Sequence, residues 1–162
     1  MELGPPEPLA PSHRTGDFAC GEPSLDEWLK RRALPNQASG ASRTFVVADA
    51  ATRVRGYYAM AAGAVALQAA TGTVRRNMPD PIPVIVLGRL AVDREAQGRQ
   101  LGAALLRDAV LRAIAVSQDA GVRAVLVHAL HERARQFYAG YGFQPSPIHP
   151  LTLMLRLGSA KP

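Results

Sequence analysis

The chain has 162 residues, 48% of them apolar and 20% charged, which predicts a globular protein with one hydrophobic core. The formal net charge is +6 and nearly all basic residues are arginines, which suit planar, bidentate recognition of phosphate. The sequence shows neither an apolar run long enough for a membrane span nor a signal-peptide pattern, and its single cysteine, Cys20, excludes an internal disulfide, so we expect a cytoplasmic protein.

Residues 1–16 form a proline-rich segment that we expect to contribute a short edge strand, ahead of a single domain over residues 17–162. A helix is expected next, with Ser24 as its N-cap and Trp28 on its apolar face as a core anchor. It ends in the basic cluster 30–32. Cations stabilise a helix C-terminus, but their number here also indicates a phosphate-binding surface.

Two strands, 43–48 and 54–60, are predicted by runs of β-branched and aromatic residues, and the short polar segment between them predicts a hairpin. The second strand is expected to continue into the small apolar residues of 61–70. Residues 72–83 contain two adjacent arginines and several prolines. We expect them to form an ordered loop that leads into the central strand.

Residues 84–92 predict a buried strand, and the apolar run after residue 103 predicts a long helix with most of its circumference covered. Later segments predict a buried strand over 122–129, a short helix over 131–141 and a final strand over 151–157. This order predicts an α/β (α+β) fold with a mixed, mainly antiparallel sheet and flanking helices. The long helix makes the two strands that it joins parallel.

Between the strand 84–92 and the long helix lies a loop with glycines at positions 98 and 102. Unpaired N–H groups meet the positive end of the helix dipole at such a point, which suits a phosphate or pyrophosphate. The signal is weak by itself, because neither the Rossmann nor the Walker glycine pattern is present. What remains is the spacing Gln97-x-x-x-x-Gly102, which is separated from Leu-Ala-Val-Asp by three residues.

Two motifs resemble the GNAT family of N-acetyltransferases. Residues 88–93 and 97–102 read Gly-Arg-Leu-Ala-Val-Asp and Gln-Gly-Arg-Gln-Leu-Gly, similar to the family's acyl-CoA loop, [Q/R]-x-x-G-x-[G/A]. Residues 137–143 read Phe-Tyr-Ala-Gly-Tyr-Gly-Phe, similar to its downstream F-Y-x-x-x-G-F segment. Gln100 departs from the pattern, because it occupies the position of the first glycine.

The resemblance implies a splayed parallel strand pair that accommodates the pantetheine arm of acetyl-CoA. It implies that main-chain groups of the central strand pair with pantetheine and that the loop's N–H groups hold the pyrophosphate. The coenzyme-binding candidates are Leu90, Ala91, Val92, Gln97, Gly98, Arg99, Gln100, Leu101, Gly102 and Ala103. Tyr138 would donate a proton to the leaving thiolate, whose acid resembles a cysteine thiol with a pKa of about 8.5.

Two glycine-related positions leave alternatives open. Gly88 marks either a bulge that aims an N–H at the acetyl oxygen or a point of tight packing under the helix. Gln100 either crowds the phosphate with its side chain or lies in the first helical turn and points away.

No residue is an evident general base. Asp93 and Glu132 lie near the motifs, but the sequence shows no partner that would tune either of them. A lysine amine, with a pKa of about 10.4, needs deprotonation, whereas an α-amino group near 7.7–8.0 is already partly neutral. The missing base therefore favours an α-amine, such as an aminoacyl ester. The histidines show no metal-ligand spacing, so we expect no metal and interpret His128 as a core residue.

Residues 18–29, 75–79 and 127–130 add a resemblance to the GNAT toxins of toxin–antitoxin modules. It implies acetylation of the α-amine on aminoacyl-tRNA, a ribbon-helix-helix antitoxin and a homodimer. The substrate-binding candidates are Lys30, Arg31, Arg32, Arg75, Arg76 and Arg89. Arg89 lies in an apolar strand, so it either pairs with a buried acid or lines the acceptor groove. Acetylation of a small amine or protein N-terminus, and a non-catalytic module that binds RNA or antitoxin, remain alternatives.

Overall fold

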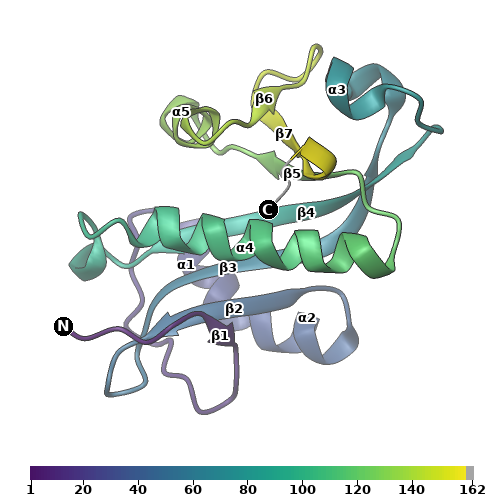
Figure 1. Ribbon diagram of the computed structural model, residues 1–162. Helices are drawn as coiled ribbons and strands as arrows, with labels where there is room; N and C mark the ends of the chain where they lie inside the picture. The colour runs from purple at the N-terminus through teal and green to yellow at the C-terminus, as the bar shows by residue number, and fades with distance from the viewer. Residues whose placement is uncertain (160–162) are drawn as a thin grey trace. The chain divides into compact units, whose positions relative to one another are not determined.

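The computed structural model describes residues 1–159 (Figure 1). Its strands are β1 (Glu7–Pro8), β2 (Arg43–Ala48), β3 (Val54–Val65), β4 (Ile82–Val92), β5 (Ala124–His128), β6 (Gln144–Pro145) and β7 (Thr152–Arg156). Its α-helices are α1 (Pro23–Arg31), α2 (Ala33–Ser39), α3 (Gly72–Arg75), α4 (Leu101–Asp119) and α5 (Glu132–Gly140). Short 3-10 turns cover Leu67–Ala69, Arg94–Ala96 and Leu157–Ser159.

The strands form a seven-stranded sheet in the order β1-β2-β3-β4-β5-β7-β6. Strands β4 and β5 are parallel, with a register from Val84 opposite Ala124 to Leu87 opposite Val127. The pairs β1–β2, β2–β3, β5–β7 and β6–β7 are antiparallel. The predicted mixed, mainly antiparallel sheet with one parallel pair is confirmed. Among the described helices, none combines the length and the apolar character needed to cross a membrane.

The chain divides into two compact units that interleave along the sequence. The first contains residues 1–61 and 88–109, and the second contains 62–87 and the residues from 110 onward. Because the chain passes between the units three times, β3, β4 and α4 each contribute residues to both.

One face of the strands in the first unit packs against α1. The ring of Tyr57 on β3 lies edge-on to Phe18 and parallel to Trp28, with centroids 5.5 and 6.1 Å away. Its hydroxyl donates a hydrogen bond to the Leu25 carbonyl of α1 at 2.7 Å. The buried core on this side comprises Leu9, Phe18, Leu29, Ala33, Val46, Val54, Tyr57 and Ala91.

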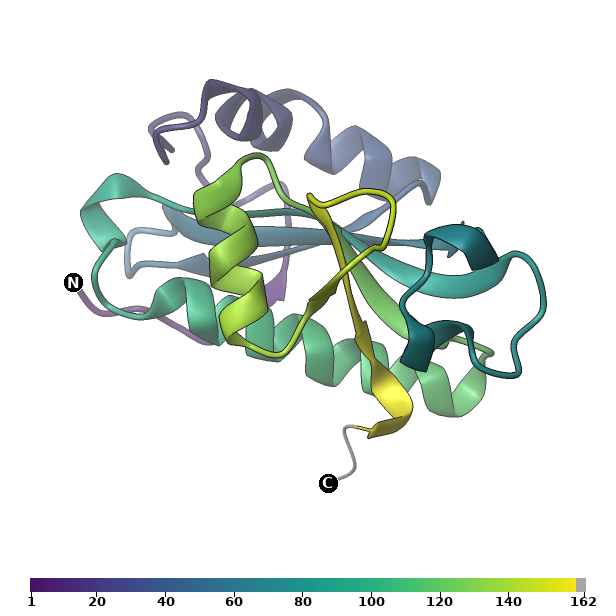
Figure 2. The same ribbon diagram turned by 90° about the horizontal axis from the view of Figure 1, so that it is seen from above.

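The opposite face of these strands packs against α4, because side chains alternate along β3. A Cβ at Gly56 would lie 3.0 Å from side-chain carbons of Leu101 and Leu105, so glycine lets the helix approach closely. The hydroxyl of Tyr58 donates to the Asp108 carboxylate. Figure 2 shows α1 and α2 on one face of the strands and α4 on the other.

The second unit has its core around β5, where every residue from Ala124 to Val127 is buried. That core comprises Val65, Ala69, Ala70, Val74, Ile82, Val84, Ala124, Leu126 and Met154. The guanidinium of Arg123 donates to three carbonyls at the end of α3, those of Val74 and Thr73 at 3.0 Å and of Arg76 at 3.2 Å. This distant arginine satisfies carbonyls that a one-turn helix leaves unpaired.

The predicted start of the first helix is wrong by a short distance. Helix α1 begins at Pro23, with Glu22 as N-cap and no side-chain capping bond, so Ser24 lies inside the first turn. Proline suits this position, because its fixed φ is helical and its missing N–H has no partner there.

Four further expectations differ from the structure. The segment 72–83 contains helix α3, and β6 was not predicted. Helix α4 is not covered around most of its circumference, because Leu111 and Val116 are 54% and 40% exposed. His128 is exposed rather than in the core, with its Nδ1 3.0 Å from the Thr152 hydroxyl.

Candidate active site

A buried arginine anchors the segment that leads into the glycine loop. The Nε of Arg55, a residue only 6% exposed, donates to Asp49 at 3.0 Å. Its Nη1 donates to Asp93 at 3.1 Å and Glu95 at 2.7 Å. Sequence reasoning missed Arg55, although a charged residue among the apolar residues of β3 was a signal that a buried partner exists.

Asp93 is the centre of this network rather than a free base. Its Oδ1 accepts the N–H of Ala19 at 3.0 Å, and its Oδ2 accepts the N–H of Glu95 at 3.1 Å as well as the Arg55 guanidinium. The carboxylate thereby caps the 3-10 turn Arg94–Ala96 at the end of β4. The expectation that Asp93 lacks a partner is wrong.

The side chain of Gln97 fixes the start of the glycine loop. Its Nε2 donates to the carbonyls of Val92 at 3.0 Å and Cys20 at 3.1 Å. Its backbone N–H closes the preceding turn on the Arg94 carbonyl at 3.4 Å. Gln97 therefore determines where the loop begins, and the N–H groups suited to a pyrophosphate lie further along the chain.

Gln100 adopts a left-handed backbone conformation of the kind that favours glycine. Its φ is +59°, in the left-handed region, where a side chain costs about 1–2 kcal/mol. Its carbonyl accepts the N–H of Ala104 at 3.2 Å, and α4 begins at Leu101. The alternative in which Gln100 lies inside the first helical turn is therefore wrong.

The first turn of α4 presents N–H groups without a carbonyl partner in the helix. In any α-helix the opening N–H groups are unpaired, which here are those of Leu101, Gly102 and Ala103. Gly98, Arg99 and Gln100 are exposed beside them, and no residue from 97 to 103 is acidic. Such a donor set at the positive end of a helix fits the pyrophosphate of a coenzyme.

Replacing Gln100 by glycine tests both consequences of this conformation. We expect the free energy of unfolding in urea to rise by up to about 1 kcal/mol, because the strain of positive φ is removed. We expect titration calorimetry to show tighter acetyl-CoA binding if the Gln100 side chain crowds the phosphate. An unchanged dissociation constant would reject crowding.

The inverse substitution, Gly98→Ala, is the matched control. Gly98 has φ +81° and a new Cβ there would meet no atom within 4 Å, so strain alone should cost about 1 kcal/mol. A stability loss for Gln100→Gly would contradict the strain argument.

Gly88 lies in an open part of β4. It is exposed, and a Cβ there would meet nothing nearer than the Ala59 carbonyl oxygen at 4.0 Å. The alternative in which position 88 is a glycine because of tight packing under the helix is therefore wrong. The bulge that would aim an N–H at the acetyl oxygen stays a prediction.

Tyr138 on α5 is a protonated phenol in an aromatic cluster. It is 8% exposed, and its ring lies 5.2 Å from that of Phe137 and 5.6 Å from that of Phe143. Burial raises the pKa of Tyr138 to about 12, so the hydroxyl keeps its proton throughout the neutral range. Tyr141, the other tyrosine of this motif, is 52% exposed.

Glu132, the other carboxylate near the motifs, also has a partner. Its carboxylate accepts hydrogen bonds from the Arg135 guanidinium, one of them at 2.8 Å, which lower its pKa. A carboxylate with a lowered pKa is a weaker base. The expectation that Glu132 lacks a partner is wrong. Within the described residues, no group of three or more histidines, cysteines or acids could hold a metal ion.

Arg89 has an aromatic partner instead of a buried acid. Its guanidinium carbon lies 4.6 Å from the centre of the half-buried Trp28 ring, which also stacks on Tyr57. A cation over an indole gains about 0.5–1 kcal/mol at a partly exposed site. The alternative in which Arg89 pairs with a buried acid is therefore wrong. A role for Arg89 in lining the acceptor groove stays a prediction.

The remaining basic candidates are exposed and belong to different units. Lys30, Arg31 and Arg32 lie at the end of α1, where the Nε of Arg31 is 2.7 Å from Glu27. Arg75 and Arg76 lie at the end of α3.

Comparisons with known proteins show which family the chain resembles. Residues 41–145 match the acetyltransferase (GNAT) domain family. A tRNA-acetylating toxin of Mycobacterium tuberculosis is 51% identical over 96% of this chain and 93% of that protein. The structure of AtaT complexed with acetyl-methionyl-tRNAfMet matches with a TM-score of 0.90 and 26% identity, covering 98% of this chain and 97% of that one.

A tyrosine-to-phenylalanine mutant of AtaT, bound to the C-terminus of the antitoxin AtaR and to acetyl-CoA, matches with a TM-score of 0.83. Its identity is 26%, and the match covers 97% of this chain and 94% of that one. The family match covers more than half of the chain, and the 51% identity extends over 96% of it. The chain therefore belongs to the GNAT family of N-acetyltransferases.

Proposed function

We propose that this protein is a toxin that acetylates the α-amino group of the amino acid on aminoacyl-tRNA and thereby blocks translation. The observation that carries the proposal is the 51% identity, over 96% of the chain, to a tRNA-acetylating toxin. The loop at the start of α4 and the buried phenol of Tyr138 supply groups that the chemistry needs.

The coenzyme acetyl-CoA supplies the acetyl group as a thioester. The N–H groups of Leu101, Gly102 and Ala103 would hold its pyrophosphate, together with the exposed backbone of 98–100. Main-chain groups of Leu90–Val92 would pair with its pantetheine arm. The Arg55 network holds the preceding turn in place, so these donors need little rearrangement on binding.

Tyr138 would donate its O–H to the sulfur as the carbon–sulfur bond breaks. A phenol with a pKa of about 12 remains a donor at every working pH. Complete transfer of its proton to a thiolate, whose acid has a pKa of about 8.5, is uphill. The proton that the amine loses on acylation replaces it, so the products are an amide and a free thiol, and Tyr138 ends in its initial state.

The paired state of both nearby carboxylates supports an α-amine substrate. Asp93 is held by Arg55 and Glu132 by Arg135, so neither is available as a base. An α-amino group with a pKa of about 7.7–8.0 is partly neutral at physiological pH and attacks without one.

The basic clusters supply contacts for the RNA backbone. We assign Lys30, Arg31, Arg32, Arg75, Arg76 and Arg89 to phosphate binding. Arg31 already pairs with Glu27, which leaves Lys30 and Arg32 the more available cations of α1. A ribbon-helix-helix antitoxin and a homodimer complete the proposal. The structure of the AtaT relative bound to the C-terminus of the antitoxin AtaR supports an antitoxin as a partner.

Incubation with labelled acetyl-CoA and total charged tRNA tests the function directly. We expect the label to become RNA-bound and to leave the RNA as an N-acetyl amino acid when the ester is hydrolysed. Neutralising Arg75 and Arg76 together should raise the KM for charged tRNA about tenfold or more at physiological salt, because two phosphate contacts are lost. Label on small amines or peptide N-termini instead, with activity that survives this double change, would favour the alternative substrates.

A further inference from the structure

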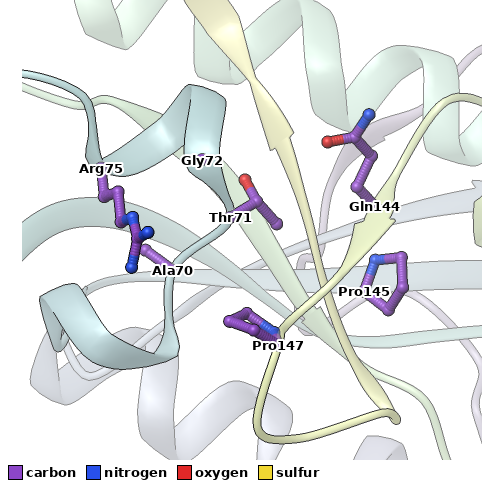
Figure 3. Close-up of a pocket in the computed structure, with 7 residues that line it drawn as sticks. All are labelled: Ala70, Thr71, Gly72, Arg75, Gln144, Pro145 and Pro147. Atoms are coloured by element: carbon purple, nitrogen blue, oxygen red, sulfur yellow. The ribbon is translucent and has the colours of Figure 1, made fainter.

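A pocket of about 490 Å³ lies in the second unit, outside the residues assigned to the coenzyme (Figure 3). This volume is in the range of small-molecule sites. In Figure 3 one wall comes from the segment that opens α3 and the other from β6 and the residues after it. The lining residues are Ala70, Thr71, Gly72, Arg75, Gln144, Pro145 and Pro147.

Ser146 ties the two walls together. It is 5% exposed, and its hydroxyl donates to the Ala69 carbonyl at 2.6 Å, next to the first lining residue of the α3 wall. The same oxygen accepts the N–H groups of Ile148 and His149 at 3.3 Å. Its own N–H donates to the Thr152 carbonyl at 2.7 Å. The pocket is therefore preformed on its β6 side.

The α3 wall is held by Arg123, whose guanidinium binds three carbonyls at the end of that helix. Arg75, by contrast, is exposed, and the structure records no ion pair for it among the described residues. A wall that is held in place and carries a guanidinium without an ion pair is suited to binding an anion.

Thr71 adds a hydroxyl that the fold does not use. The residue is 7% exposed, its Oγ1 has no hydrogen-bond partner within the described part of the chain, and it does not cap α3. Leaving such a group buried and unpaired destabilises the fold. Rotation about χ1 exchanges the hydroxyl with the methyl group. In Figure 3 the side chain extends from the α3 wall towards the β6 wall, so this rotation would offer the hydroxyl to a bound molecule.

The lining chemistry suits a nucleotide. Arg75 provides a cation for a phosphate, and the exposed amide of Gln144 can both donate to and accept from a base or ribose. Pro145 and Pro147 provide flat apolar surface, and no lining residue is acidic. RNA-binding proteins read unpaired nucleotides by this combination of backbone contact, packing and edge hydrogen bonds.

We propose that the pocket between α3 and β6 binds one unpaired nucleotide of the RNA substrate, with its phosphate against Arg75 and its ribose or base against Thr71 and Gln144. The proposal rests on the proposed function, because aminoacyl-tRNA ends in a single strand. An acidic peptide of a protein partner is the other class of ligand and is separated by the test.

The test compares Thr71→Val, Gln144→Ala and Arg75→Gln with the matched control Arg107→Gln, which removes an exposed charge from α4. For each variant we would measure KM and kcat with charged tRNA. We would also measure the affinity for a mini-helix RNA with a single-stranded 3′ end, without coenzyme and at several salt concentrations. The affinities for acetyl-CoA and for the antitoxin, and the melting temperature, complete the set.

We expect Thr71→Val and Gln144→Ala each to weaken RNA binding about three- to tenfold without changing its salt dependence, because neither removes a charge. Arg75→Gln should weaken binding about tenfold and reduce the slope of log K against log salt by about 0.7–0.9. The acetyl-CoA affinity should stay unchanged throughout. The melting temperature of Thr71→Val should equal or exceed that of the wild type, because an unpaired buried hydroxyl is removed.

Each of the following outcomes contradicts the pocket proposal. If Thr71→Val and Gln144→Ala bind RNA as the wild type does, and Arg75→Gln binds it no more weakly than Arg107→Gln, then Arg75 acts only through the general positive charge of the surface. Variants that spare RNA but weaken antitoxin binding assign the pocket to the protein partner. If the wild type labels RNA but the variants match it, the pocket proposal fails alone. If the wild type neither labels nor binds RNA, the proposed function fails as well.

Discussion

Replacing Tyr138 by phenylalanine is expected to lower kcat for acetyl transfer at least about 100-fold, since a positioned proton donor contributes about 10²–10⁴. The substitution removes one hydroxyl and keeps the ring contacts with Phe137 and Phe143. The structure records no hydrogen bond of this hydroxyl among the described residues, so stability and acetyl-CoA affinity should stay at wild-type levels. Steady-state kinetics with charged tRNA, beside a thermal melt, measure both.

Tyr141→Phe is the matched control for this result. Tyr141 belongs to the same motif and its ring also contacts Phe137, but it is 52% exposed. We expect its kcat to remain within about threefold of the wild type, because an exposed hydroxyl is replaced readily by water. If Tyr138→Phe kept more than about a third of the wild-type kcat, the proton donor would be another group.

Replacing Arg55 by methionine is expected to destabilise the fold by about 3–5 kcal/mol, the usual cost of removing one partner from a buried ion pair. The side chains of Asp49 and Asp93 are 7% and 6% exposed, so Asp93 would stay buried without a cation and Asp49 would keep only the more exposed Arg53. Glu95 is 70% exposed and should add little. Urea unfolding at neutral pH measures the loss, and titration calorimetry should show weaker acetyl-CoA binding, because the turn before the loop loses its anchor.

The pH dependence of this loss has a definite sign. Burial alone would raise the pKa of Asp49, but hydrogen bonds from the Arg53 N–H and the Arg55 guanidinium outweigh it and lower the pKa. A lowered pKa stabilises the fold above the ordinary value of about 3.9 and stops doing so as the pH falls through the lowered value. The stability difference between wild type and Arg55→Met should therefore be largest at neutral pH and shrink below about pH 4.

Arg53→Met is the control on the same carboxylate. Arg53 binds Asp49 at 3.2 Å, but its side chain is 42% exposed. An exposed pair contributes about 0–1 kcal/mol, so this variant should lose little. If the two arginine variants lost equal free energy of unfolding, burial would not explain the contribution of Arg55 to stability.

Local patterns in the sequence were sufficient for most of the secondary structure and for the family. Strand β2 was predicted at its observed bounds, because a run of β-branched and aromatic residues carries a signal within a few positions. The parallel pairing of β4 and β5 followed from the helix between them. The glycine loop and the segment around Tyr138 were recognisable because their spacing is local and unusual.

The partners of the charged residues were decided only by the tertiary structure. Arg55 meets Asp93 and Glu95 across 38 and 40 positions of the chain, and Arg123 reaches the α3 carbonyls across nearly 50. No local period encodes such contacts, because they depend on which strands become neighbours. For the same reason the sequence predicted no partner for Asp93 and placed His128 in the core.

Gln100 shows where the two kinds of information meet. The sequence determined that a glutamine stands at a glycine position and left the shape of the loop open. The tertiary structure decided that shape: Gln100 has φ +59°, with the chain held before it by Gln97 and after it by the start of α4. A strained residue persists where the surrounding contacts determine the backbone more strongly than its own side chain does.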